Sequence, residues 1–140
     1  MVKKEKPKII FTTGKRKKAV ARAKAISGTG IVKINSVPLQ IWGNGSVRLF
    51  VKEPLVLAGE AAKKVDIFVN VRSGGIWGQA EASRMAIARA LLESSKSTEL
   101  RQKFLQYDRN LLVYDPRRTE PHHPGASKRG SRRHKQRSKR

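Results

Sequence analysis

The stretch from Val65 to Ser95, VDIFVNVRSGGIWGQAEASRMAIARALLESS, predicts a β-strand, a glycine-containing loop and a long α-helix in that order. Large aliphatic residues occupy every second position from Ile67 to Val71, which is the period of a strand with one buried face. Beyond the loop, from about Gln79 to Ser95, small and aliphatic residues recur at helical spacing. This stripe comprises Ala80, Ser83, Ile87, Ala90 and Leu91. Side chains as small as these would let the helix approach a sheet closely.

The residues before this unit predict three further strands. Residues 9–13 are a β-rich run that ends at Gly14, and alanine at every second position from Ala19 to Ala25 predicts a second strand. One face of that strand would be small and packable, and the other partly cationic. After a turn at residues 28–30, we expect Ile31 to Ile34 to pair back onto the preceding strand as a hairpin.

Two shorter helical regions complete the prediction. Ser46 is a plausible N-cap for a short helix that must stop near Pro54, and Pro54 can open a second turn that runs through Ala58. Residues 99–107 form a further amphipathic stretch. The order of the elements indicates an α+β fold, with a mostly antiparallel sheet of four strands covered by helices on one face.

Composition divides the chain into three parts. Residues 1–8 are a lysine-rich lead, and residues 9–114 hold all the large apolar side chains except those of Met1 and Val2. After Tyr114 there is no Val, Ile, Leu, Met, Phe, Trp or Tyr. We therefore expect a globular domain over residues 9–114 and an extended basic tail over residues 115–140 that becomes ordered only on its partner.

The charge of the chain points to a polyanionic partner. Its 140 residues include 32 Lys plus Arg and 10 Asp plus Glu, a formal net charge of +22. Nucleic acid is the first candidate and an anionic membrane surface the second. No stretch approaches the roughly 20 apolar residues of a membrane span, and the lead lacks the apolar region of a secretory signal. We therefore expect a cytoplasmic protein that binds nucleic acid.

The sequence contains no convincing catalytic or metal-binding constellation. Cysteine is absent, and His122, His123 and His134 lie among prolines and basic residues, where no packed pocket can fix ligands. The glycine pairs complete neither a dinucleotide fingerprint nor a phosphate loop. We expect no enzyme activity, no cofactor, no metal and no small-molecule substrate.

Basic clusters and the glycine loop are the candidate RNA-binding elements. Four consecutive basic residues precede the second strand, where they would lie at one edge of the domain, although a lone run of this kind is also typical of a solvated turn. In the loop at residues 73–79, glycines would let backbone N–H groups and a helix N-terminus meet a phosphate, with an arginine on either side. The tail offers cations without aromatics, so it should read phosphates and shape rather than base sequence. The predicted RNA-binding residues are Lys15, Arg16, Lys17, Lys18, Arg72, Gly74, Gly75, Gln79, Arg84, Arg117, Arg118, Lys128, Arg129, Arg132, Arg133 and Lys135.

Three motifs in order resemble those of one family, the universal small-subunit ribosomal protein nine. Residues 73–91, SGGIWGQAEASRMAIARAL, resemble its signature, although Ser73 stands where the family usually has the first of three glycines. Residues 14–23, GKRKKAVARA, resemble its opening strand, and the terminal Ser138-Lys139-Arg140 resembles its ending. Residues 115–121 are more similar to the archaeal and eukaryotic branch, and the short lead favours the archaeal one.

This resemblance implies a fold, a location and a set of partners. The fold would be that of the second domain of ribosomal protein five, with an unusual left-handed βαβ crossover. The location would be the head of the small subunit, on 16S-type rRNA and beside neighbouring head proteins. The tail would reach the anticodon stem-loop of the P-site tRNA, with Arg137, Ser138, Lys139 and Arg140 as the contacting residues.

Two other classes remain as alternatives. A nucleoid or chromatin-like DNA-binding protein would share the composition, but the ordered motifs and the glycine loop count against it. An enzyme on the same fold is conceivable because one fold hosts unrelated functions. The missing catalytic constellation counts against the enzyme.

Overall fold

Three long strands owe their place in the sheet to alternating side chains. The computed structural model describes residues 9–122. In β1 (Ile10–Arg16), β2 (Ala19–Ser27) and β5 (Val65–Arg72), every second residue faces the helices and the others face away. The predicted strand at residues 9–13 continues past Gly14, because the backbone at this glycine lies directly against a helix and pairs with Ala21.

The sheet has five strands rather than the four predicted, in the order β1-β2-β5-β3-β4, because the short β4 adds to its edge. β2 is antiparallel to β1 and to β5, whereas β3 (Val32–Ile34) is parallel to β5 and antiparallel to the short β4 (Val37–Pro38). The α+β class with a mostly antiparallel sheet is therefore confirmed.

The expected hairpin between β2 and β3 is wrong, because β5 lies between these strands. The turn at residues 28–30 wraps around the beginning of β5. One carboxylate oxygen of Asp66 accepts hydrogen bonds from the backbone N–H groups of Thr29 and Ile31, both 2.8 Å long. The N–H of Ile67 then donates to the carbonyl of Ile31 at 2.8 Å. These bonds carry the chain past β5 and place β3 on its far side.

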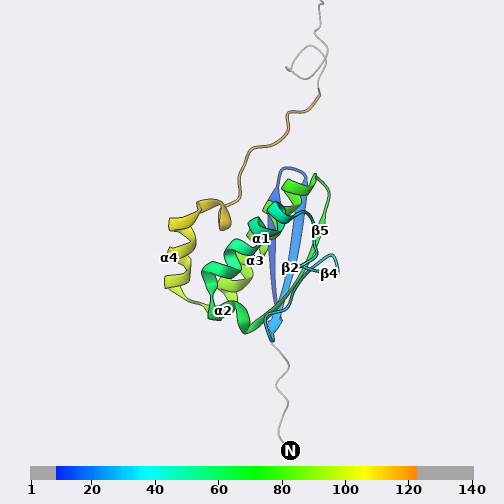
Figure 1. Ribbon diagram of the computed structural model, residues 1–140. Coiled ribbons are helices and arrows are strands. Elements are labelled where there is room, and N and C mark those ends of the chain that lie inside the picture. The colour runs from blue at the N-terminus through cyan, green and yellow to red at the C-terminus, as the bar shows by residue number, and fades with distance from the viewer. Residues whose placement is uncertain (1–8, 123–140) are drawn as a thin grey trace, which may run out of the picture.

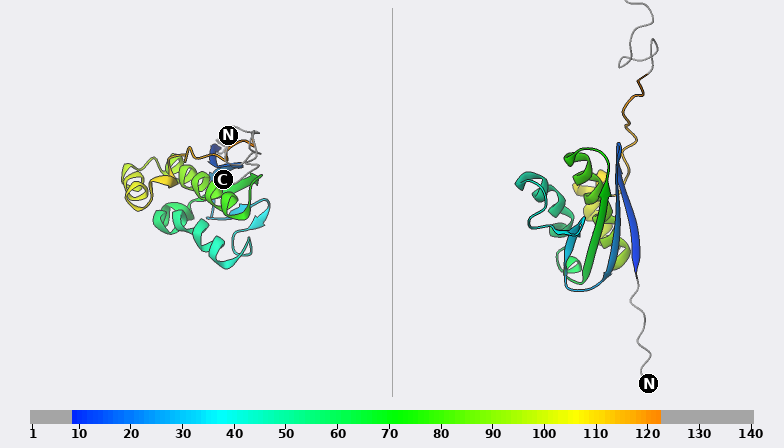
Figure 2. Two further views of the ribbon diagram at one scale, coloured as in Figure 1. Left: turned by 90° about the horizontal axis from the view of Figure 1, so that it is seen from above. Right: turned by 90° about the vertical axis from the view of Figure 1, so that its right-hand side faces the viewer.

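All the helices cover one face of the sheet (Figure 2). They are α1 (Gly45–Ala58), α2 (Glu60–Lys63), α3 (Ile76–Ser95), α4 (Thr98–Tyr107) and the 3-10 turn η1 (Arg109–Leu111). α1 is a single helix with Pro54 inside it, not two short ones, and its N-cap is Asn44 rather than Ser46. Burial of Val47, Val51 and Pro54 on one face holds the helix together where proline removes a hydrogen bond.

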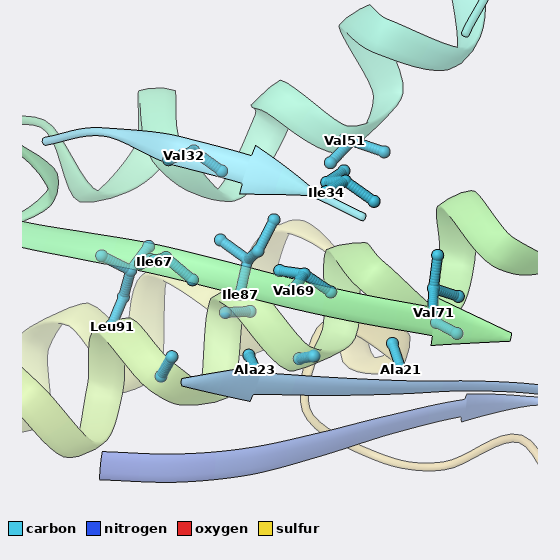
Figure 3. Close-up of a cluster of buried hydrophobic side chains, with 14 of the residues drawn as sticks. Ala21, Ala23, Val32, Ile34, Val51, Ile67, Val69, Val71, Ile87 and Leu91 are labelled. Atoms are coloured by element: carbon cyan, nitrogen blue, oxygen red, sulfur yellow. The ribbon is translucent and has the colours of Figure 1, made fainter. Parts of the chain in front are cut away.

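The core lies between α3 and the sheet (Figure 3). The alanines of β2 are at most 1% exposed and give α3 a flat surface to pack on. The predicted stripe on α3, Ala80, Ser83, Ile87, Ala90 and Leu91, is completely buried. On β1, the Thr12 hydroxyl donates to the carbonyl of Ala86 at 2.8 Å.

The connection from β3 to β5 forms the βαβ unit that the resemblance implied. It leaves β3, passes through α1 and α2 over the helical face and returns in the parallel β5. In Figure 1 the helices lie in front of the sheet, both strands run upward and the connection steps leftward from β3 to β5. This is the left-handed sense, the opposite of the usual crossover.

Within the described part of the chain, no helix is both long and apolar enough to cross a membrane.

Candidate nucleic-acid interface

The tight turn between β1 and β2 presents adjacent cations at one end of the domain. Arg16 pairs with Ala19 in the register, so Lys17 and Lys18 form the turn itself. Lys17 has a φ of 50°, and Lys15, Lys17 and Lys18 are exposed. None of these three lysines makes an ion pair with another residue of the described range 9–122. Their charge is therefore available to an external anion.

The loop between β5 and α3 lies beside this turn. Val20 pairs with Arg72 across the strands, so the loop leaves β5 next to the beginning of β2. Gly74 has a φ of 74°, and a Cβ atom there would lie 2.9 Å from the Cβ of Ala19. Glycine is thus required at position 74 by the backbone and by the close approach to β2. We call this group of residues, Lys15, Lys17, Lys18, Arg72, Gly74 and Gly75, the basic end.

Gly75 differs from Gly74 because the fold does not require it. Its φ is −93°, and a Cβ atom would meet nothing within 4 Å. It is the N-cap of α3, where no side chain caps the helix and the first turn carries no acidic residue. The first N–H groups of a helix lack partners inside the helix and carry a partial positive charge. Gln79 closes the loop, with its side-chain amide donating to the carbonyl of Ser73 at 3.3 Å.

The beginning of the tail is fastened near the basic end by Asp115. Its carboxylate accepts hydrogen bonds from Arg117, and it also forms an ion pair with Arg16. The side-chain and backbone hydrogen bonds of Arg117, followed by that of Arg16, hold the pKa of Asp115 well below its ordinary value. Figure 1 shows the chain leaving the domain from here toward the end where the β1–β2 turn lies. The exposed Arg117 and Arg118 lie on this path.

Arg84, one of the predicted RNA-binding residues, is buried among ion pairs within the domain. It is 6% exposed, and its guanidinium makes ion pairs with Glu53 and with Asp108, the latter at 2.7 Å. The guanidinium carbon also lies 4.3 Å from the centre of the Phe50 ring. The arginine does not face solvent, because two carboxylates from other helices and loops neutralise it inside the domain. Arg16 likewise forms ion pairs, with Glu81 and with Asp115.

Seven of the predicted RNA-binding residues thus meet at or beside the basic end, and two leave along the tail. The first group is Lys15, Arg16, Lys17, Lys18, Arg72, Gly74 and Gly75, with Gln79 closing the loop behind it; the second is Arg117 and Arg118. The remaining predictions, Lys128, Arg129, Arg132, Arg133, Lys135 and the four terminal residues Arg137, Ser138, Lys139 and Arg140, lie outside the described residues.

The open face of the sheet was not among the predicted RNA-binding elements. Phe11 pairs with Lys24, Lys24 with Phe68, and Phe68 with Lys33, so aromatic and cationic side chains alternate across four strands. Arg22 and Asn70 form part of the next row. The signal was present in the strand alternation, because these residues occupy the positions between the buried ones. What the sequence lacked was the strand order that aligns them.

Residues 9–122 offer little for other chemistry. No three histidine or acidic side chains gather there as a metal site. Four acids, Glu53, Glu81, Asp108 and Asp115, form ion pairs with arginine, and Glu60 forms one with Lys63.

A family model and individual relatives both match this chain over nearly its full length. The chain matches the family model described as "Ribosomal protein S9/S16" over residues 14–140. It is 44% identical over 131 residues to small ribosomal subunit protein uS9 of Methanococcus maripaludis strain C7, which covers 94% of this chain and 98% of the relative. It is 48% identical over 131 residues to the protein of the same name from Pyrobaculum aerophilum, covering 94% and 92%.

Proposed function

The chain belongs to the ribosomal protein S9 family, and we propose on this premise that its basic end binds the RNA of the small ribosomal subunit. Membership makes it a structural protein of the small subunit, of the archaeal type, and not an enzyme. Its partners are accordingly ribosomal RNA and other ribosomal proteins. The proposal concerns which of its residues touch the RNA.

The observation that carries the proposal is the close packing of two segments: the β1–β2 turn, here called the lysine turn, and the glycine loop at residues 73–79. Lys17 and Lys18 come from one hairpin, and Gly74 and Gly75 from a loop more than 50 positions later, yet Gly74 packs on Ala19. The turn supplies side-chain cations, and the start of α3 supplies uncapped backbone N–H groups beside them. Both groups bind phosphate oxygens without reading base sequence. A folded RNA backbone is the polyanion that such a surface fits.

A charge-matched pair of variants tests this proposal in the full chain. Lys17→Gln/Lys18→Gln removes two cations from the basic end, and Lys64→Gln/Lys103→Gln removes two exposed cations elsewhere. Affinity for small-subunit rRNA is measured at several salt concentrations. Each lost phosphate contact flattens the slope of log affinity against log salt by about 0.7 to 0.9. We expect this flattening only in the first variant, and equal behaviour of the two variants would refute the role of the basic end.

For the tail, we propose that Arg137, Ser138, Lys139 and Arg140 contact the anticodon stem-loop of the P-site tRNA. Support comes from the resemblance of the chain's ending to that of the family, and from the basic composition of residues 115–140. Small subunits carrying a chain that stops at residue 136 should assemble normally but bind P-site tRNA less tightly. The loss should be similar for tRNAs with different anticodons, since cations on phosphates carry no base information. Unchanged tRNA affinity would limit the tail to rRNA binding.

A further inference from the structure

The open face of the sheet carries exposed aromatic rings in the middle of a cationic surface. Phe11 is 71% exposed and Phe68 is 37% exposed, although both lie in long strands of a well-packed fold, Phe11 in the edge strand β1 and Phe68 in β5. All the helices cover the opposite face (Figure 2), so nothing in the described chain packs over these rings. Aromatic side chains on the open face of a sheet are one known surface on which unpaired RNA bases stack.

Register places these rings and the neighbouring cations in one row. Reading across β1, β2, β5 and β3, the row is Phe11, Lys24, Phe68 and Lys33. Two strand spacings of about 4.8 Å separate the two rings, so their backbones lie roughly 10 Å apart. Each ring therefore has a lysine on a neighbouring strand and room above it for a separate planar group.

The charge of this face identifies the kind of partner. The next rows add Arg22 beside Asn70, and then Lys15 and Arg72 on either side of Val20. The only acid on this face of the long strands is Asp66, at the far end beside Ile26, and it is occupied by the turn at residues 28–30. The rings lie in a shallow hollow with Arg22, Lys24, Lys33 and Asn70 in its lining. A protein partner with an apolar patch would gain from the rings but would have to desolvate these cations.

We infer that this face is a stacking platform for unpaired RNA bases: Phe11 and Phe68 each take one base, and Lys24, Lys33 and Arg22 take the phosphates between them. Aromatic rings beside cations are the combination that single-stranded nucleic acids bind, because every base has a π-face and every linkage a charge. The face runs without interruption to Lys15 and Arg72 of the basic end. The inference rests on the proposed function, because it assumes an RNA partner, and it adds the class of RNA: unpaired nucleotides rather than a duplex.

Paired variants of the full chain separate stacking from charge. Phe11→Leu/Phe68→Leu removes the rings and keeps apolar bulk, Phe11→Tyr/Phe68→Tyr keeps the rings, and Lys24→Gln/Lys33→Gln removes the cations. Affinity is measured for a short labelled single-stranded RNA and for a duplex of the same sequence, at several salt concentrations. We expect the leucine variant to bind the single strand about tenfold more weakly with an unchanged salt slope. The tyrosine variant should bind as the unsubstituted chain does, and the glutamine variant should show a flatter slope.

A crosslinking experiment in assembled small subunits distinguishes RNA from protein on this face. Phe11 is replaced by the photoreactive analogue p-benzoylphenylalanine, and the subunits are irradiated. A crosslink to rRNA supports the inference. A crosslink to a neighbouring protein, no crosslink at all, or an unchanged single-strand affinity of the leucine variant overturns it.

The two RNA surfaces can fail independently. If Lys17→Gln/Lys18→Gln has no effect while Phe11→Leu/Phe68→Leu weakens single-strand binding, the basic end is refuted and the platform stands. The reverse pattern refutes the platform alone. Melting temperatures of all variants should agree within a few degrees, because none of the substituted side chains is buried.

Discussion

The side chain of Asn35 extends the parallel pairing of β3 and β5 by one residue. Its amide nitrogen donates to the carbonyl of Val71 at 3.1 Å, and its amide oxygen accepts from the N–H of Val71 at 2.8 Å. Asn35 itself has a φ of 48°, which turns the chain out of β3 while its own N–H still bonds to Val69. One residue thus ends a short strand and satisfies the backbone of the long strand beside it.

Replacing Asn35 should destabilise the fold in two separable steps. Asn35→Gly keeps the left-handed backbone accessible but leaves both backbone groups of Val71 without their partner, at a cost of about 1–3 kcal/mol. Asn35→Ala adds the cost of a Cβ in that conformation, about 1 kcal/mol more. Urea unfolding of the three chains measures both differences. Equal stability of the glycine variant and the unsubstituted chain would mean that water replaces the amide without loss.

The close contact of β1 with α3 depends on Gly14. A Cβ atom at this position would lie 2.0 Å from the carbonyl oxygen of Ala82 and 2.8 Å from the N–H nitrogen of Ala86, both backbone atoms that cannot move alone. Gly14→Ala should therefore cost at least about 3 kcal/mol by forcing the strand and the helix apart. Gly75→Ala is the matched control, since its Cβ would meet nothing within 4 Å. Thermal unfolding should separate the two variants clearly, and a stable Gly14→Ala chain would contradict the described packing.

Arg84 should act on stability rather than on RNA binding. Arg84→Met removes the cation between Glu53 and Asp108 and leaves two carboxylates close together, each less than 30% exposed. A loss of about 2–4 kcal/mol is expected, at or below the cost of breaking a fully buried pair. The triple variant Arg84→Met/Glu53→Gln/Asp108→Asn should recover part of it, because no charge is then left unpaired. If Arg84→Met instead changed the salt slope of rRNA binding and left stability intact, the arginine would belong to the RNA surface after all.

Asp66 should make the fold sensitive to acid. Hydrogen bonds from the backbone N–H groups of Ile31 and Thr29 lower the pKa of this carboxyl group below its ordinary value. A carboxyl group with a lowered pKa in the folded state stabilises the fold above its unfolded pKa of about 3.9, and that contribution is lost as the pH falls through the folded value. Asp66→Asn keeps an acceptor oxygen without the charge. The stability difference between the two chains should therefore be largest at neutral pH and shrink below about pH 4, and a difference independent of pH would rule out this role of the charge.

Local patterns in the sequence predicted most of the strands and helices, but they did not predict which strands pair across long distances in the sequence. The alternation in β2 and β5 and the stripe on α3 follow from burial of one face, which periodicity reports directly. Periodicity does not predict the position of β3. The side chain of Asp66, 35 positions away, binds the backbone of Ile31 and so favours pairing of β3 with β5. The predicted helix end near Pro54 was wrong for a related reason, since burial of this helix face in the folded domain outweighs the hydrogen bond that proline removes.

The candidate RNA surface shows the same division. Basic residues and glycines were visible as motifs, but only the fold distinguishes the exposed Lys17 from the buried Arg84. The row from Phe11 to Lys33 required the strand order, which no local pattern contains. Local sequence motifs therefore indicate the type of partner more readily than the set of contacts.

Gly75 offers the sharpest separation of function from folding at the basic end. Its backbone is extended and its surroundings are empty, so Gly75→Val should leave the melting temperature of the free chain nearly unchanged. The same side chain would stand at the uncapped start of α3, where a phosphate must approach the backbone N–H groups closely. We therefore expect the variant to lose in competition with the unsubstituted chain for incorporation into small subunits, and to be released at lower salt. Gly74→Val is the contrasting variant, since a Cβ there would strain the left-handed backbone and press on Ala19, so it should fail to fold stably. If Gly75→Val unfolds as readily as Gly74→Val, the loop is structural throughout; if it folds and assembles normally, RNA does not approach α3 here, and the lysine turn must act without the loop.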